Sequence, residues 1–184
     1  MDQVPVKTYF VIGPESSGTR VTTTILMSAG CVGDDMHSQR LDRFINSDTG
    51  LMDEFAEADM LVVRRSVPHG GPHLYPELGE IAAKFEALGP VLPVICVRDW
   101  YANVRSKIQR GHQKNREDGY NALQKEVECI SRFLVGWYKP FYIFNTSLLF
   151  GDPWRALCGL MEYTGLQFPP RLESTIFNAD AQYE

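Results

Sequence analysis

The chain has 184 residues, of which 44% are hydrophobic and 22% charged, the composition of one globular domain rather than of a disordered chain. Its 18 Lys and Arg against 23 Asp and Glu give a net charge of −5, which disfavours a general duplex-DNA binder and a polybasic membrane anchor. No apolar run approaches the roughly 20 residues that span a bilayer. The first seven residues show no secretory signal pattern. We therefore expect a cytoplasmic protein with no nucleic-acid partner and no membrane span.

The cysteines are widely spaced and form no C-x-x-C pair. There are four of them: Cys31, Cys96, Cys129 and Cys158. Because such spacing matches neither a zinc site nor a disulfide framework, we expect buried free thiols in a reducing compartment.

Short apolar segments alternate with longer amphipathic segments along the chain. Strands are predicted at 8–12, 60–63, 91–97 and 141–144, and helices at 19–29, 76–88, 100–112, 121–137 and 152–165. Met60–Val63 is continuously apolar, as expected of a strand that is covered on both faces. The pattern predicts an α/β fold, a three-layer αβα sandwich with a mainly parallel sheet, as a single domain over residues 1–184.

The turn between the first strand and the first helix, Gly13-Pro14-Glu15-Ser16-Ser17-Gly18-Thr19-Arg20, has the composition of a P-loop-like anion site. Two glycines five residues apart let backbone N–H groups converge on an anion, and the helix N-terminus adds its partial positive charge. The hydroxyls of this turn and the guanidinium of Arg20 are further donors to phosphate or sulfonate oxygens.

The same turn departs from the ATP-type P-loop. That motif places Lys and then Ser or Thr after the second glycine, and the hydroxyl ligates Mg²⁺. Here Thr19 and Arg20 hold those two places, and a guanidinium cannot ligate Mg²⁺. An anionic ligand that needs no metal is therefore the better prediction.

Three segments resemble the sulfotransferases that use PAPS (3′-phosphoadenosine 5′-phosphosulfate), in particular small microbial or phage-type members of this P-loop superfamily. Ser17-Gly18-Thr19-Arg20 resembles the core of the loop that holds the 5′-phosphosulfate. Val94–Asp99 with Ser106 resembles the 3′-phosphate segment, in which an arginine ends a strand and a serine follows eight residues later. The stretch 144–166 resembles a later segment of the family.

The resemblance implies a nucleotide site made of Ser16, Ser17, Gly18, Thr19, Arg20, Arg98 and Ser106, with PAPS as co-substrate and no metal. The family usually has a lysine where this chain has Ser16. The positive charge at the leaving sulfonate must then come from another side chain. Arg20 is the nearest candidate in sequence, and Arg64, Arg65 and Lys107 are the alternatives.

A base near the acceptor oxygen is the remaining requirement of sulfonate transfer. The segment after the second strand lies at the carboxyl edge of a parallel sheet, where ligands bind. It resembles a segment of the family that has a histidine at the position where this chain has Ser66. His69 is therefore the first candidate base and His73 the second, and the alternative is a surface loop without chemistry. Residues 46–54 resemble an acceptor-side stretch, but a turn and helix start is the favoured interpretation.

The favoured function is transfer of the sulfonate of PAPS to a hydroxyl or amine of a small-molecule or glycan acceptor, with His69 and Arg20 as catalytic residues. Two other classes stay open. The first is a P-loop kinase or NTPase with a variant loop, with Asp99 as its metal ligand. The second is a catalytically inactive nucleotide-binding protein, which the serine at position 16 favours.

Overall fold

A five-stranded parallel sheet forms the centre of the molecule, with strand order β2-β3-β1-β4-β5. The computed structural model describes residues 5–33, 41, 44–45, 55, 57–69 and 74–169. The strands are β1 (Lys7–Pro14), β2 (Val32–Gly33), β3 (Met60–Val67), β4 (Val91–Val97) and β5 (Tyr142–Asn145). The neighbours of β1 in the sheet are therefore β3 and β4, and not β2, which is the next strand in the sequence.

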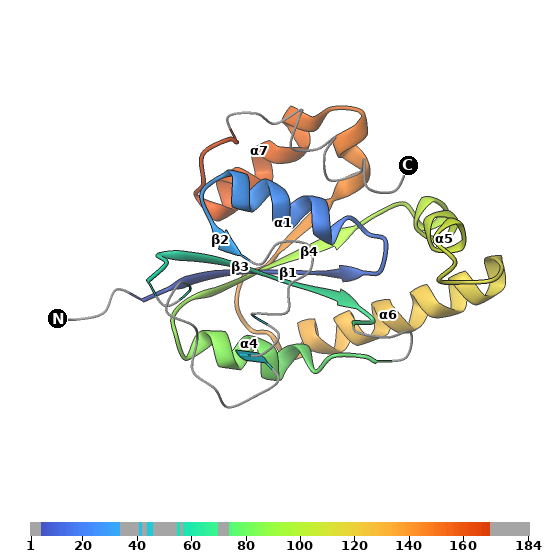
Figure 1. The fold of residues 1–184 in the computed structure, drawn as a ribbon, viewed down its shortest axis with the longest axis horizontal. Helices are drawn as coiled ribbons and strands as arrows, with labels where there is room; N and C mark the ends of the chain where they lie inside the picture. The colour runs from blue at the N-terminus through green and yellow to red at the C-terminus, as the bar shows by residue number, and fades with distance from the viewer. Residues whose placement is uncertain are drawn as a thin grey trace.

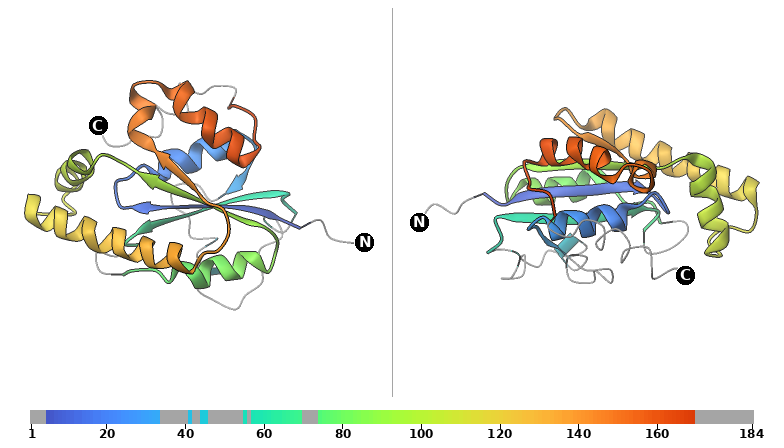
Figure 2. Two further views of the ribbon diagram at one scale, coloured as in Figure 1. Left: turned by 180° about the vertical axis from the view of Figure 1, so that it is seen from behind. Right: turned by 90° about the horizontal axis from the view of Figure 1, so that it is seen from above.

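Helices cover both faces of this sheet. The elements are α1 (Thr19–Ser28), α4 (Leu78–Glu86), α5 (Trp100–Gln109), α6 (Arg116–Gly136) and α7 (Pro153–Thr164), with the 3-10 helix η1 (Thr146–Phe150). In Figure 1, α1 and α7 lie on one face and α4 and α6 on the other, and the views in Figure 2 agree. Helix α5 stands beyond the carboxyl ends of the strands. The predicted three-layer α/β sandwich is confirmed.

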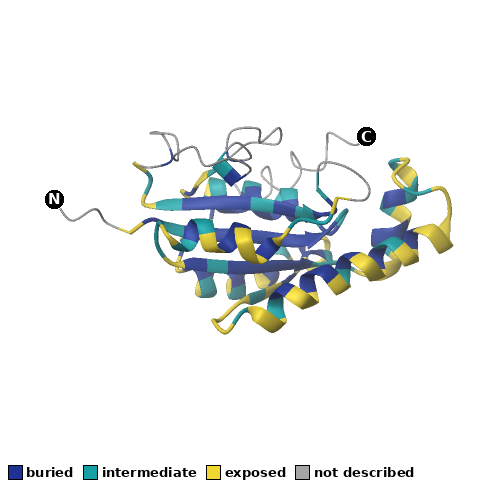
Figure 3. Cartoon of the chain, turned by 90° about the horizontal axis from the view of Figure 1, so that it is seen from below, coloured by how far each residue is buried: buried dark blue, intermediate teal, exposed yellow. Residues whose placement is uncertain are grey.

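The strands are continuously apolar because each face of the sheet has its own core. On β1, Phe10 and Ile12 pack into the core beneath α4 and α6, whereas Tyr9 and Val11 pack into the core beneath α1 and α7. All four are fully buried. Helix α6 is correspondingly two-sided, with a buried face toward the sheet and an exposed outer face (Figure 3). Successive side chains of a strand point to opposite faces of the sheet, so each strand packs against both helical layers.

The strand order creates a crevice at one edge of the sheet. After β1 the chain crosses to β2 and returns to β3, on one side of β1, whereas after β4 it continues to β5 on the other side. The connections that leave β1 and β4 therefore diverge at the carboxyl ends of these neighbouring strands. In open α/β sheets, ligands bind at such a switch point.

Several element boundaries differ from the sequence prediction. Strand β3 continues to Val67, since its polar end pairs with the last residues of β1. Helix α6 begins at Arg116, five residues early, where the Asn115 side chain accepts a hydrogen bond from the Asp118 N–H. Because this first turn is polar, the periodicity of apolar residues does not reveal where the helix begins.

Two further expectations concern the state of the cysteine thiols and the presence of membrane-spanning helices. The four thiols are free, as predicted, but Cys158 is exposed while the other three are buried. In the described ranges, no helix is long and apolar enough to span a membrane.

We expect Phe133→Ala to lower the free energy of unfolding by about 3 kcal/mol, because it removes a buried ring. This ring packs edge-on against Phe10, with 6.1 Å between the two ring centroids. Thermal unfolding measures this as a lower Tm. Val135→Ala on the same helix is the control, since Val135 is 79% exposed. It should change stability by less than about 0.5 kcal/mol, and equal losses in the two variants would contradict the burial of this face.

Candidate functional site

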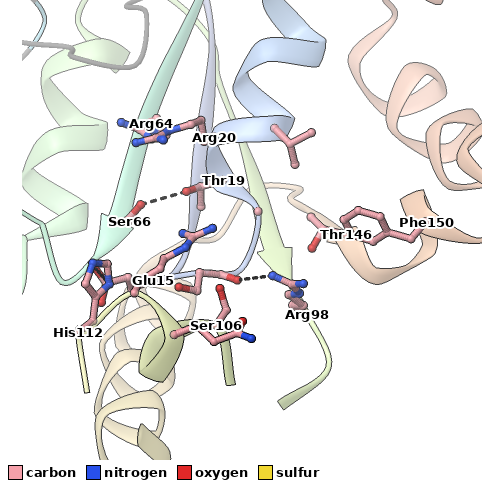
Figure 4. Close-up of a pocket in the computed structure, with 15 residues that line it drawn as sticks. Glu15, Thr19, Arg20, Arg64, Ser66, Arg98, Ser106, His112, Thr146 and Phe150 are labelled. Carbon is pink, nitrogen blue, oxygen red and sulfur yellow. Dashed lines mark hydrogen bonds and ion pairs between the residues drawn. The ribbon is translucent and has the colours of Figure 1, made fainter. Parts of the chain in front are cut away.

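A cavity of about 660 Å³ opens at the carboxyl ends of β1, β3 and β4 (Figure 4). The loop after β1, the end of β3, the second half of α5 and η1 all contribute to it. Its lining residues are Glu15, Ser16, Gly18, Thr19, Arg20, Val21, Arg64, Ser66, Arg98, Ser106, Gln109, Arg110, His112, Thr146 and Phe150. The cavity therefore occupies the switch point of the sheet.

The loop at residues 13–18 bends sharply to enter α1. Gly18 has φ 89°, in the left-handed region, and a Cβ there would lie 2.9 Å from the Thr146 side chain. Glycine is required at this position both by the backbone angle and by the close approach of η1. Ser16 has φ 65°, a conformation that costs a non-glycine residue about 1–2 kcal/mol. The surrounding structure must hold Ser16 in place.

Two neighbouring elements hold the loop. The Thr146 hydroxyl donates to the Ser17 carbonyl at 2.7 Å and lies 3.1 Å from the Val97 carbonyl, so that it joins the loop to the end of β4. The buried Asn103 side chain donates from Nδ2 to the Glu15 carbonyl at 2.9 Å. The loop is thus fixed from both sides without a ligand.

Hydrogen-bond donors at the loop lack partners among the described residues. Within this part of the chain, no side chain caps the N-terminus of α1, where Gly18 is the N-cap residue, and an uncapped helix start can bind an anion. The Ser16 Oγ is buried, and no group within the described parts of the chain forms a hydrogen bond with it. A buried hydroxyl without a partner is costly, and a bound anion at this position would accept its hydrogen bond.

Positive charge is concentrated in this cavity. Among the described residues, four arginines line it (Arg20, Arg64, Arg98 and Arg110), and Glu15 is the one acidic residue of that lining. This contrasts with the net charge of −5 of the whole chain. Burial lowers the pKa of the Arg20 guanidinium, and an anionic ligand beside it would offset that desolvation. Positively charged side chains thus outnumber acidic ones among the described lining residues, which favours an anionic ligand.

The structure brings Arg98 and Ser106 together with the loop, although they come from the end of β4 and from the middle of α5. Arg98 donates from Nη1 to the Ser16 carbonyl at 3.4 Å, and its guanidinium lies 5.9 Å from the centre of the Phe150 ring. Both side chains point toward the cavity in Figure 4. The eight-residue spacing noted in the sequence corresponds to a real convergence.

Two hydroxyls of the loop are placed differently from the other predicted ligands. Ser17 is fully buried and is not among the lining residues. The Thr19 hydroxyl does line the cavity, but it forms a 3.0 Å hydrogen bond with the Ser66 hydroxyl of β3. This bond connects the start of α1 to the neighbouring strand.

The structure separates the four candidates for the missing lysine charge. Arg20 and Arg64 line the cavity. Arg65, the next residue on β3, is 3% exposed and donates to the Arg64 carbonyl. Lys107 is completely buried in an ion pair with Glu126 of α6, away from the cavity lining. Burial raises the pKa of Glu126 to about 7, although Lys107 opposes the rise.

His69, the first candidate base, is not among the residues that line the cavity; its backbone N–H donates to the Leu74 carbonyl at 3.0 Å. His73 and the stretch 46–54 lie outside the described residues. A different histidine, His112, does line the cavity. Its Nδ1 lies 3.1 Å from Oε1 of Glu15.

The residues that sequence reasoning missed come mainly from α5 and η1. Asn103 and Arg110 lie three residues before and four residues after the predicted Ser106, which places all three on one face at α5. That spacing is a signal that this face turns toward the loop. His112 follows the helix and Thr146 lies in a short 3-10 turn, and neither position carries such a pattern.

Asp99, the metal ligand expected of a kinase-like site, caps a helix instead. Its side chain is the N-cap of α5 and accepts a hydrogen bond from the Ala102 N–H at 2.8 Å. Asp99 does not line the cavity. In the part of the chain that the structure describes, no group of three or more His, Cys, Asp or Glu side chains is arranged to hold a metal ion.

Comparison with known proteins identifies the fold. By sequence, the chain matches no family model and no curated protein. Its structure is similar to that of the sulfotransferase domain from the Synechococcus PCC 7002 olefin synthase, with a TM-score of 0.64 and 12% sequence identity. The match covers 93% of this chain and 77% of that domain. The chain therefore has a sulfotransferase-like, P-loop-like α/β fold.

We expect Lys107→Met to destabilise the protein by about 3–5 kcal/mol, because it leaves the Glu126 carboxylate buried and unpaired. The double variant Lys107→Met/Glu126→Leu should recover most of this loss, since it removes both charges. Denaturant unfolding measures both effects. Arg105→Met, at an exposed position of the same helix, is the control. If Lys107→Met were as stable as the wild type, the result would contradict a buried ion pair between Lys107 and Glu126.

Proposed function

We propose that this protein binds PAPS and transfers its sulfonate to a hydroxyl or amine of a small-molecule or glycan acceptor. The observation that carries the proposal is the convergence of Arg98 and Ser106 on the same cavity as the loop at residues 16–20. Two anion sites within one cavity match a nucleotide that carries phosphate at two separate positions. The sulfotransferase-like fold supports the same assignment.

Each part of the cavity has a role in this proposal. The loop N–H groups, the Ser16 hydroxyl and Arg20 bind the 5′-phosphosulfate. Arg98 and Ser106 bind the 3′-phosphate, for which a guanidinium supplies two parallel donors. Loop and arginine are already fixed relative to each other by the contact between Arg98 and the Ser16 carbonyl. Such preorganisation lowers the entropic cost of binding and of aligning the reacting groups.

The reaction forms a bond from the acceptor oxygen to sulfur and breaks the bond from sulfur to the 5′-phosphate oxygen. The electron pair of the broken bond stays on the phosphate, so negative charge develops next to the loop. Arg20 and the uncapped start of α1 stabilise this charge where the family usually has a lysine. Arg64 is the second cation at the cavity wall.

Two other functions stay open, and each predicts a different ligand response. A variant P-loop kinase or NTPase would require Mg²⁺ and would prefer ATP or GTP. The role of Asp99 as the cap of α5 disfavours this alternative. An inactive nucleotide-binding protein would bind PAP, the product nucleotide, and transfer nothing.

We expect PAP to raise the Tm of the protein much more than 5′-AMP does, because only PAP carries the 3′-phosphate that Arg98 and Ser106 bind. At 100 times its Kd a ligand adds about 2.7 kcal/mol of stability, which a thermal-shift assay detects. The PAP shift should be the same in EDTA and in Mg²⁺.

Arg98→Ala should abolish the difference between PAP and AMP, whereas Arg105→Ala, at an exposed position of α5, should preserve it. Equal shifts from PAP and AMP in the wild type would contradict the 3′-phosphate site. A PAP shift that is lost in EDTA and restored by Mg²⁺ would favour the kinase-like alternative.

We expect Arg20→Ala to lower turnover by about tenfold or more, equivalent to at least about 1.4 kcal/mol in the barrier. The reason is that Arg20 supplies positive charge beside the leaving phosphate. Binding of PAP should persist through Arg98 and Ser106. The assay follows labelled sulfonate from PAPS into a panel of phenols, sugars and lipids with free hydroxyls. Full turnover by Arg20→Ala would assign the charge to Arg64 instead.

A further inference from the structure

His112 and Glu15 form a hydrogen-bonded pair at the wall of the cavity. Nδ1 of His112 lies 3.1 Å from Oε1 of Glu15, and both residues line the cavity. The side chains are 41% and 28% exposed, so they are accessible from the cavity and from solvent. The His112 backbone N–H donates to the Lys107 carbonyl at 2.9 Å, which fixes the turn after α5.

The pair lies on the side of the loop away from Arg98, where the proposed function places the 3′-phosphate. In Figure 4, His112 and Glu15 lie on the same side as Ser66, whereas Arg98 and Phe150 lie on the opposite side. If the 3′-phosphate binds at Arg98 and the phosphosulfate at the loop, the acceptor approaches from the side of Ser66 and His112. In-line attack on sulfur requires such an approach, opposite the leaving phosphate.

The contact with Glu15 selects one tautomer of the neutral imidazole. A carboxylate accepts hydrogen bonds only, so Nδ1 carries the hydrogen and Nε2 keeps its lone pair. No hydrogen bond to Nε2 is found within the described residues. The arrangement of a carboxylate that orients an imidazole is the one that makes histidine an effective general base.

We propose that His112 is the general base of this protein and that Glu15 is its positioning residue. The assignment rests on the proposed sulfonate transfer. As the acceptor oxygen forms its bond to sulfur and the sulfur–phosphate oxygen bond breaks, the hydroxyl proton moves to Nε2 of His112. The Glu15 carboxylate stabilises the imidazolium that results.

The other candidates for the base are placed less favourably. Ser66, which stands where the family segment has its histidine, has its hydroxyl in a hydrogen bond with Thr19, and an ordinary serine is too weak a base. His69 lies outside the cavity lining. The base would therefore come from the end of α5 rather than from the segment after β3.

The test compares His112→Gln with the wild type in two independent measurements. The first is transfer of labelled sulfonate from PAPS to a panel of phenols, sugars, lipids and amines and to water. There His112→Gln should lower kcat by about 10²-fold and leave KM for PAPS and the Kd for PAP within about twofold. Gln113→Ala, next in the chain and not a lining residue, is the matched control and should keep wild-type kcat.

The second measurement is the ring ¹⁵N NMR spectrum of His112, which needs no turnover. The wild type at a pH where the ring is neutral should show the proton on Nδ1, with and without PAP. Glu15→Gln, whose amide can also donate to the ring, should shift the proton toward Nε2 and lower kcat less than His112→Gln does, because the base is retained but misoriented.

The outcomes separate this proposal from the proposed function. If the wild type transfers sulfonate but His112→Gln keeps full kcat, the base is elsewhere while the function stands, and a loss in His69→Gln would then assign the role to His69. A proton on Nε2 in the wild type would also overturn the assignment. If the wild type binds PAP yet transfers sulfonate to no phenol, sugar, lipid or amine of the panel and not to water, the proposed function fails and the base assignment falls with it.

Discussion

The Thr146 hydroxyl is the contact on which the geometry of the cavity depends. It joins the Ser17 carbonyl of the loop to η1 and lies beside the Val97 carbonyl at the end of β4. Because β1 and β4 are neighbours at the switch point of the sheet, this side chain holds the loop against the end of β4, and the contact of Arg98 with the Ser16 carbonyl completes the connection. Gly18 makes the contact possible, since a Cβ there would meet Thr146. The fold therefore positions the two parts of the cavity to which the proposed function assigns the phosphates.

The charge distribution connects this geometry to function. An acidic chain places four arginines around one cavity, and the four come from α1, β3, the end of β4 and the end of α5. Bringing like charges together costs free energy, and an anion bound among them lowers that cost. The uncapped start of α1 and the buried Ser16 hydroxyl, which has no hydrogen-bond partner among the described residues, would also gain hydrogen bonds from such an anion. In the proposed function, the phosphate groups of PAPS are this anion.

The alternation of apolar and amphipathic segments predicted the three layers and the parallel sheet, and the resemblance to sulfotransferases implied that Arg98 and Ser106 approach the loop. The positions of Lys107 and His112 depend instead on how α5 packs against α6 and against the loop. Lys107 is buried in its pair with Glu126, and a lysine in a polar helix gives no sign of this. His112 reaches Glu15 only because the chain turns back after α5, so the sequence favoured the histidines that follow β3.

In the proposed function, one cavity binds the two phosphates of a single nucleotide. A crystal structure of the protein with PAP tests this binding mode most directly. We expect the 5′-phosphate on the backbone N–H groups of residues 16–20 and the 3′-phosphate on the Arg98 guanidinium and the Ser106 hydroxyl. PAP bound with its 3′-phosphate in solvent, or with its 5′-phosphate away from the loop, would contradict this binding mode.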